Sequence, residues 1–155
     1  MSRGLITIMA TITHLGLIVL TIGLIFYVTD HDVIVERDAT PYLGPAMALA
    51  SMACVFFALA RSFGVAERDA VTPGILRPAL ASALVSYVGM LIVGSGVYAL
   101  IRSDALSFVL FAARYVGSPF VDLSSAWAGI VVAAFLLLAR FDNASEPRQG
   151  GHDEL

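Results

Sequence analysis

Four long apolar stretches, separated by polar segments, constrain this chain more than any other feature. They cover about residues 4–28, 43–63, 79–101 and 121–141. At a rise of about 1.5 Å per residue, each would cross a hydrocarbon core about 30 Å thick as a single α-helix. With 59% hydrophobic and 14% charged residues, the chain is too apolar for a soluble domain of 155 residues. We therefore predict an all-α membrane domain over residues 1–141, a bundle of four transmembrane helices.

A fifth apolar stretch, residues 105–116, is too short to cross a membrane. Turn signals at 117–119 cut it off, and Ser103 or Asp104 stands where a helix N-cap belongs. Arg114 would lie at its wet C-terminal end. We therefore predict a short interfacial or re-entrant helix just before the fourth span, and the sequence leaves these two depths open.

The orientation in the membrane follows from the arginines, because positive residues in short loops are retained on the cytoplasmic side. With four spans, six arginines fall on one side of the membrane and three on the other. The larger group is Arg3, Arg61, Arg68, Arg77, Arg140 and Arg148, and the smaller group is Arg37, Arg102 and Arg114. Both termini are therefore predicted to be cytoplasmic, and the polar tail, residues 142–155, to be disordered. All nine basic residues are arginine, and Ala, Leu, Val and Gly dominate. This composition is typical of GC-rich bacterial genomes and favours a bacterial plasma membrane.

The two halves of the chain resemble each other at a displacement of 73 positions. This shift superposes several pairs: Gly16 on Gly89, Gly23 on Gly96, Tyr42 on Tyr115, Gly44 on Gly117 and Ser51 on Ser124. Each half holds two spans and so enters and leaves the membrane on the same side, which would make the repeats parallel. We therefore consider a parallel two-plus-two repeat, and chance similarity in a chain rich in Ala and Gly is the alternative.

Small residues recur at four- and seven-residue spacing along the spans. In lipid no hydrophobic force holds helices together, so close approach of two backbones needs such residues. Ladders lie on the second and fourth spans, and glycine pairs on the first and third: Ala46, Ala50, Cys54 and Ala58; Ser125, Gly129 and Ala133; Gly16 with Gly23; Gly89 with Gly96. We predict that these residues pack the helices into a compact left-handed bundle with crossing angles of about +20°.

His14 is the only ionisable residue deep within a predicted span. Its ring could ligate a haem, carry a proton or bind a quinone headgroup. A b-type haem would need a second axial ligand, for which only Met52 or Met90 could serve. The alternative is a neutral histidine that is hydrogen-bonded to a hydroxyl such as that of Ser86 or Ser95. We expect this structural role and predict no cofactor.

Charged residues gather at the predicted outer end of the bundle, and they are Arg102, Asp104, Arg114 and Asp122. Asp122 begins the fourth span, where a carboxylate interacts favourably with the helix dipole. The four residues could instead form one outer polar site that gates a path through an oligomer. Transport by this chain alone is disfavoured, because no Asp or Glu lies in the central part of any span.

No motif in the sequence indicates catalysis. A single cysteine, Cys54, cannot form an internal disulfide or build a Cys-based metal site, and we interpret it as a packing residue. His31 lies between two aspartates, in what we interpret as a solvated acidic loop. The arginines are scattered singly, so no cationic patch exists for nucleic acid. We therefore predict a non-enzymatic protein without a metal site.

Three features together resemble the small uncharacterised four-helix integral membrane proteins of actinobacteria. They are the two-plus-two pattern of spans, the acidic first loop that runs into Tyr42-Leu43-Gly44-Pro45, and the short arginine-bearing connection between the second and third spans. The resemblance covers most of residues 1–141 and implies a fold and a membrane location, but no catalytic residue.

Three functions follow as hypotheses. The first is an accessory or scaffold subunit that packs against other membrane proteins or against itself within the lipid bilayer. The second is a transporter or channel component that acts as an oligomer. The third is a redox, quinone or haem role at His14.

Overall fold

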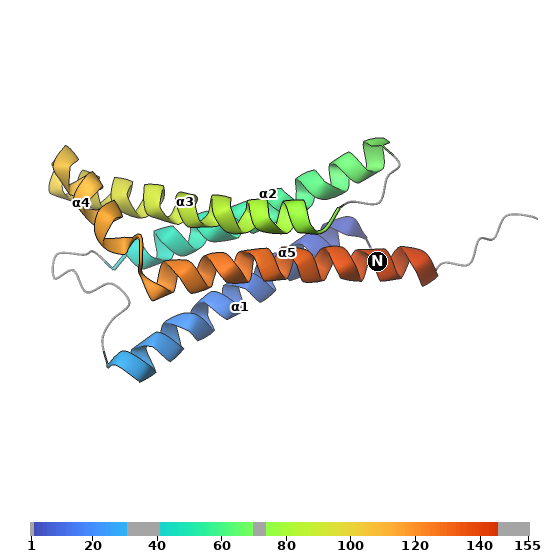
Figure 1. The fold of residues 1–155 in the computed structure, drawn as a ribbon, viewed down its shortest axis with the longest axis horizontal. Helices are drawn as coiled ribbons and strands as arrows, with labels where there is room; N and C mark the ends of the chain where they lie inside the picture. The colour runs from blue at the N-terminus through green and yellow to red at the C-terminus, as the bar shows by residue number, and fades with distance from the viewer. Residues whose placement is uncertain (1, 31–40, 70–73, 146–155) are drawn as a thin grey trace, which may run out of the picture.

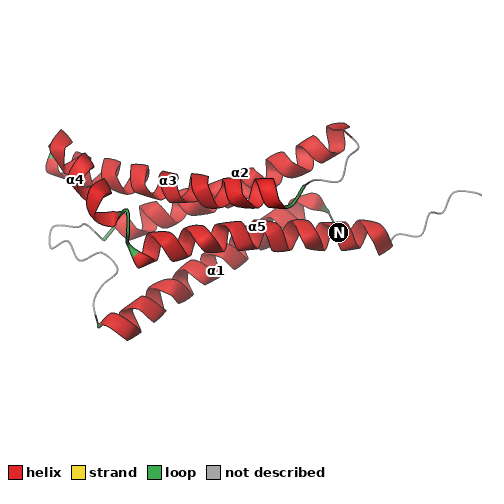
Figure 2. Ribbon diagram, viewed as in Figure 1, coloured by secondary structure: helices red, strands yellow, loops and turns green. Residues whose placement is uncertain are grey.

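The computed structural model describes residues 2–30, 41–69 and 74–145. These residues form five helices and no strand: α1 (Arg3–Thr29), α2 (Leu43–Asp69), α3 (Leu76–Arg102), α4 (Ala105–Tyr115) and α5 (Pro119–Ser145). All except α4 are long and apolar enough to cross a membrane (Figure 1, Figure 2). The predicted all-α architecture, with four long apolar helices and a short helix before the last, is confirmed.

The connection between α2 and α3 is shorter than predicted. The apolar stretches indicated a polar hairpin over residues 64–78, but α2 continues to Asp69 and α3 begins at Leu76. Pro78 lies in the first turn of α3. Its missing N–H costs nothing there, because the first N–H groups of a helix have no intrahelical partner.

The last helix also extends beyond its prediction. Residues 142–155 were expected to be a disordered tail, but α5 continues to Ser145. Residues 146–155 lie outside the described part of the chain. A helix need not end where its apolar stretch ends, because backbone hydrogen bonding continues into water as long as no residue breaks it.

Two of the long helices end at a left-handed residue that is not glycine. Asp30 ends α1 with φ 52° and ψ 28°, and Ser103 ends α3 with φ 52° and ψ 31°. Asp104 then caps α4, since its carboxylate accepts from the N–H of Leu106 at 3.1 Å and from the hydroxyl of Ser107 at 3.1 Å. Of the two predicted N-cap candidates, Asp104 is therefore the cap, and Ser103 makes the turn before it.

The four long helices form a ring, in which each contacts the next along the chain and α5 closes against α1 (Figure 1). A hydrogen bond from Trp127 Nε1 to Thr21 Oγ1, 3.2 Å long, joins α5 to α1. The end of α2, the start of α3, the start of α1 and the end of α5 lie at one end of the ring, here called the hairpin end. The short helix α4 lies at the opposite end, here called the α4 end.

The core consists of two apolar clusters, one toward each end of the ring. The cluster toward the hairpin end includes Ala10, Val55, Leu59, Val132 and Leu136. The cluster toward the α4 end includes Ile18, Met47, Met90, Phe111 and Phe120. Between these two sets, one fully buried residue on each of α1, α2 and α3 is polar, and these three residues form the candidate site described below.

At the α4 end, aromatic side chains fix α4 against α3. The ring of Phe111 stacks on Tyr115 with centroids 4.3 Å apart and lies 5.0 Å from the ring of Tyr98 on α3. Gly94 makes room for this contact, because a Cβ there would lie 2.9 Å from Met47 Sδ and 3.0 Å from Phe111 Cε1. The helix α4 is therefore packed into the end of the bundle.

Helix α1 diverges from the bundle toward the α4 end (Figure 1). Its buried residues end at Thr21. Beyond that position only Ile25 is half-buried, and large apolar side chains such as Phe26, Tyr27 and Val28 are 52%, 87% and 71% exposed. The last two turns of α1 therefore have few contacts with the rest of the chain.

Helices α1 and α3 are equivalent under the displacement of 73 positions. Both are 27 residues long, their bounds are displaced by the same 73 positions, and both end at a left-handed residue. Helices α2 and α5 have this length too but not this displacement. These agreements favour a duplication, which stays a prediction.

Candidate functional site

A chain of three polar side chains crosses the interior of the bundle. His14 Nε2 lies 2.7 Å from the hydroxyl oxygen of Ser51, which lies 2.6 Å from the hydroxyl oxygen of Ser86. The three residues come from α1, α2 and α3, and each has an exposed fraction of 0%. Two hydrogen bonds therefore join three helices at one point between the apolar clusters.

The position of each polar residue follows from the helical period. Residues four apart lie on the same face of a helix, so a polar residue within a buried row must point inward. Each of the three stands in such a row: Ala10, His14 and Ile18 on α1; Met47, Ser51 and Val55 on α2; Ser82, Ser86 and Met90 on α3. The apolar neighbours in these rows exclude lipid and water from the three polar side chains.

The hydrogen bonds can run in either direction. A neutral imidazole carries one N–H, so His14 Nε2 either donates to Ser51 or accepts from it. In both arrangements Nδ1 is left buried without a hydrogen-bond partner among the described residues. The ring thus keeps one nitrogen for a further ligand or proton.

The structure only partly matches the predicted partners of His14. Ser86 belongs to the hydrogen-bonded group, but it is linked to the histidine only through Ser51. Ser95 is fully buried, and its hydroxyl has no hydrogen-bond partner in the described part of the protein. Ser51 was missed, although it interrupts a row of apolar residues with four-residue spacing on α2, which could have indicated it.

Among the predicted packing residues, two glycines mark close approaches between helices. A Cβ at Gly129 of α5 would lie 3.0 Å from the carbonyl oxygen of Ala79 on α3 and 3.1 Å from Ala83 Cβ. A Cβ at Gly89 of α3 would lie 3.5 Å from Cys54 Sγ on α2. The α3–α5 contact is thus the tighter one.

The ladders lie at the edges of the buried faces rather than at their centres. On α2 the four ladder residues are half-buried, and the fully buried row is displaced by one position: Leu43, Met47, Ser51, Val55 and Leu59 are buried beside Ala46, Ala50, Cys54 and Ala58. On α5, Ser125 is buried, whereas Gly129 and Ala133 are half-buried. The larger residues fill the core, and the small ones let neighbouring helices approach at its margin.

The remaining glycines do not pack as expected within the chain. A Cβ at Gly16, Gly23 or Gly96 would have nothing within 4 Å. Gly16 and Gly23 are exposed on the outer face of α1. Seven-residue spacing places residues on one face, but in a chain surrounded by lipid that face can be outside as well as inside. This corrects the expectation that these three glycines hold the bundle together.

The predicted outer polar cluster divides into local roles. The guanidinium of Arg102 lies 5.4 Å from the centre of the Tyr98 ring, a cation–π contact. Asp104 caps α4, and Arg114 lies in its last turn. Asp122 lies exposed in the first turn of α5, as predicted for a carboxylate at a helix start. A shared outer site stays a prediction.

The described residues include no group of three His, Cys, Asp or Glu side chains that could hold a metal ion. The acidic loop around His31 lies largely outside the described part of the chain.

The fold and this interior define the class of protein: a small all-helical protein with four helices that could cross a membrane, three of which are joined by buried hydrogen bonds. The sequence matches the family of unknown function DUF6121 over residues 2–153, and the chain belongs to that family. No curated protein and no solved structure matches it. The resemblance to uncharacterised small helical proteins is confirmed, and an actinobacterial origin stays an expectation.

Proposed function

We propose that this protein is a non-enzymatic accessory subunit of a bacterial plasma membrane, which packs against the transmembrane helix of a partner through α1. One observation supports the proposal. Gly16 and Gly23 lie on an exposed face of α1, the helix that diverges from the bundle, and a Cβ added at either position would have no neighbouring atom within 4 Å. The partner is another membrane protein or a second copy of this chain.

Glycines on a lipid-facing surface favour association of helices. Lipid chains gain nothing from the absence of a side chain, whereas a second helix can approach the bare backbone closely and gain van der Waals contact. Ile12 and Val19 lie on the same face, at four-residue and three-residue spacing from the glycines, and both are exposed. They would flank the closest approach and pack into the grooves of a partner helix.

Purification of the tagged protein from its native membrane in a mild detergent tests this proposal. The double variant Gly16→Leu, Gly23→Leu should lose the co-purifying partner, or the dimer, because two large side chains would separate the backbones. Mass spectrometry of the bound proteins and light scattering of the complex measure the two forms of association.

Gly96→Leu is the matched control. A Cβ added at Gly96 would also have no neighbouring atom within 4 Å, but Gly96 lies on α3 and not on α1. It should leave the association unchanged. A wild-type protein that is monomeric and without a stoichiometric partner would reject the proposal, and so would a double variant that keeps its partner.

The buried polar chain supports a second candidate, a transporter or channel component that acts as an oligomer. Besides His14 Nδ1, the buried hydroxyls of Ser82, Ser95 and Ser124 have no hydrogen-bond partner among the described residues. Such groups could relay a proton. Proton flux into vesicles containing the pure protein, lost on His14→Leu, would support this candidate, and the absence of flux with the wild-type protein would reject it.

A redox, quinone or haem role would use His14 Nδ1, the ring nitrogen without a partner among the described residues. The absorption spectrum of protein purified from the native membrane tests the haem case. A chromophore that disappears in His14→Leu would support ligation, whereas a colourless wild-type protein would leave His14 with its structural role.

A further inference from the structure

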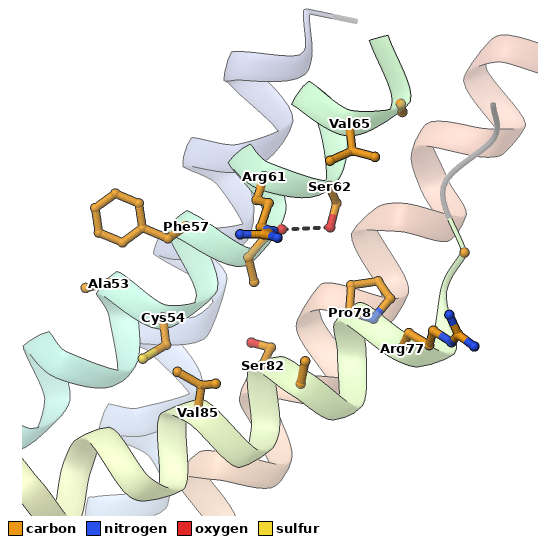
Figure 3. A pocket seen from close by; sticks show the side chains of 14 residues that line it. Ala53, Cys54, Phe57, Arg61, Ser62, Val65, Arg77, Pro78, Ser82 and Val85 are labelled. Carbon is orange, nitrogen blue, oxygen red and sulfur yellow. Dashed lines mark hydrogen bonds between the residues drawn. The ribbon is translucent and has the colours of Figure 1, made fainter. Parts of the chain in front are cut away.

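A groove opens between α2 and α3 toward the hairpin end, where the two helices diverge (Figure 3). Its volume is about 1110 Å³. This is at or above the upper end of the range of about 300–1,000 Å³ that is typical of small-molecule sites. The helices converge again near Cys54 and Val85, so the groove is narrow at its deep end and wide toward the hairpin.

Two arginines stand at the wide end of the groove, on opposite walls. Arg61 belongs to α2 and Arg77 to the first turn of α3 (Figure 3). Both are exposed, and neither makes a hydrogen bond or ion pair with another described residue. No Asp or Glu is among the described residues that line the groove. The wide end therefore carries two positive charges that no described acidic residue neutralises.

Ser82 gives the groove a buried polar group. Its side chain lines the groove from α3, has an exposed fraction of 2%, and its hydroxyl has no hydrogen-bond partner among the described residues. Ser62 also lines the groove, but its hydroxyl already donates to the carbonyl oxygen of Ala58 at 2.7 Å. A ligand that accepts a hydrogen bond would therefore find a free donor at Ser82 and not at Ser62.

The deep part of the groove is apolar. Phe57 and Val85 present large side chains that are 68% and 56% exposed, and Cys54 with small alanines forms the rest of the wall. The deep end points toward the middle of the predicted span, and the arginines lie near its edge. An occupant that satisfies both parts must have a negatively charged head and an apolar tail, oriented as a lipid is in a bilayer.

We propose that this groove binds an anionic phospholipid of the adjacent leaflet, with its phosphate between Arg61 and Arg77 and an acyl chain along Phe57 and Val85. The hydroxyl of Ser82 donates to an ester oxygen at the base of the headgroup. A zwitterionic lipid also carries a phosphate, but its headgroup cation would lie beside the two arginines and repel them, and a soluble anion would leave the apolar wall uncovered. This inference is independent of the partner proposed for α1.

The preference for anionic over zwitterionic lipid tests the role of the two arginines at the wide end of the groove. The purified protein is exchanged into nanodiscs of phosphatidylglycerol and phosphatidylcholine, and the lipids that stay bound on release are counted by native mass spectrometry. We expect the wild-type protein to retain phosphatidylglycerol preferentially. Arg61→Gln and Arg77→Gln should each weaken that preference about five-fold, the effect of one basic residue near an anionic surface.

Matched variants separate the groove from the general charge of the protein. Arg3→Gln removes the same charge at the same end of the bundle but outside the groove, and it should leave the preference unchanged. Ser82→Ala should weaken retention, whereas Ser62→Ala should not. An equal effect of Arg3→Gln and Arg61→Gln would overturn the proposal, as would a wild-type protein without any preference.

Two further measurements test whether an acyl chain occupies the deep, apolar end of the groove. Val85→Trp fills the deep end without changing charge and should abolish retention of the lipid. Cys54, the only cysteine, lines the groove, so bound lipid should slow its alkylation by a membrane-permeant maleimide in phosphatidylglycerol relative to phosphatidylcholine. Alkylation at equal rates in both lipids, or displacement of the lipid by millimolar inorganic phosphate, would overturn the proposal.

Discussion

At the scale of single residues, the hydrogen bonds among His14, Ser51 and Ser86 join three helices between the two apolar clusters of the core. Hydrogen bonds between transmembrane helices contribute modestly, about 0.6 kcal/mol on average and up to about 1.7 kcal/mol. Their effect on specificity is larger than this energy suggests, because only one rotation of each helix brings all three polar groups together. These hydrogen bonds therefore determine which faces of α1, α2 and α3 meet.

Ser51 lies at the centre of the chain, so its removal breaks both hydrogen bonds. We predict that Ser51→Ala lowers the free energy of unfolding by about 1–2 kcal/mol, since it also leaves the His14 ring without a partner. Unfolding by titration with a denaturing detergent, followed by circular dichroism, measures the change.

Ser124→Ala is the matched control. Ser124 is equally buried, but its hydroxyl has no hydrogen-bond partner among the described residues. Its replacement should be neutral or slightly stabilising, because an unpaired buried hydroxyl is removed. If both alanine variants lose the same stability, the hydrogen bonds of Ser51 are not what matters.

The sequence predicted that His14 is buried and hydrogen-bonded to a hydroxyl, but it did not identify Ser51. Serines are frequent on α2, α3 and α5, and the choice among them depends on how each helix is rotated about its axis. That rotation is set by packing of the whole bundle. A single histidine thus indicates that a polar partner exists without indicating which one.

At the scale of helices, glycines that were predicted to pack the bundle have different environments. Gly129 lies against the backbone of α3, whereas Gly96 faces open space. The difference arises because both the inner and the outer faces of a membrane helix are apolar, so hydrophobic periodicity does not show which face is covered. The sequence therefore predicted the four long helices, but it did not predict how far α2 and α5 extend or which faces of the helices are buried.

Gly129→Ala and Gly96→Ala should change stability in opposite directions. The Cβ at residue 129 would lie 3.0 Å from the carbonyl oxygen of Ala79, and a backbone atom cannot move aside without displacing α3. We expect a loss of about 1–3 kcal/mol. Gly96→Ala should gain up to about 1 kcal/mol from helix propensity alone.

Thermal unfolding of both variants in the same detergent measures this difference. The two glycines are in membrane-spanning helices and undergo the same chemical change, so effects of the detergent cancel. Equal shifts in Tm for the two variants would contradict the close approach of α3 and α5 at Gly129.

At the scale of the whole molecule, the start of α1, the end of α2, the start of α3 and the end of α5 lie at one end of the bundle (Figure 1). The arginine distribution predicts that this hairpin end is cytoplasmic. The α4 end, with Tyr42 and Asp122, then faces the opposite side of the membrane. The structure supplies the relative positions of these ends, and the charges supply the prediction of which side each occupies.

Single-cysteine labelling in a Cys54→Ala background tests this orientation. Tyr42 is 75% exposed at the α4 end, and Ser2 is exposed at the hairpin end. In intact cells, a membrane-impermeant maleimide should label Tyr42→Cys at once and Ser2→Cys only after the membrane is permeabilised. The reverse pattern would show that the arginine rule fails for this protein.

The aromatic stack at the α4 end has a mechanical consequence. Phe111 contacts Tyr98 on α3 and, through the space left by Gly94, lies beside Met47 on α2, so α2 and α3 are clamped at one end. Toward the hairpin they diverge. The packing at this joint sets the angle between α2 and α3, and through that angle it sets how far apart Arg61 and Arg77 lie at the wide end of the groove.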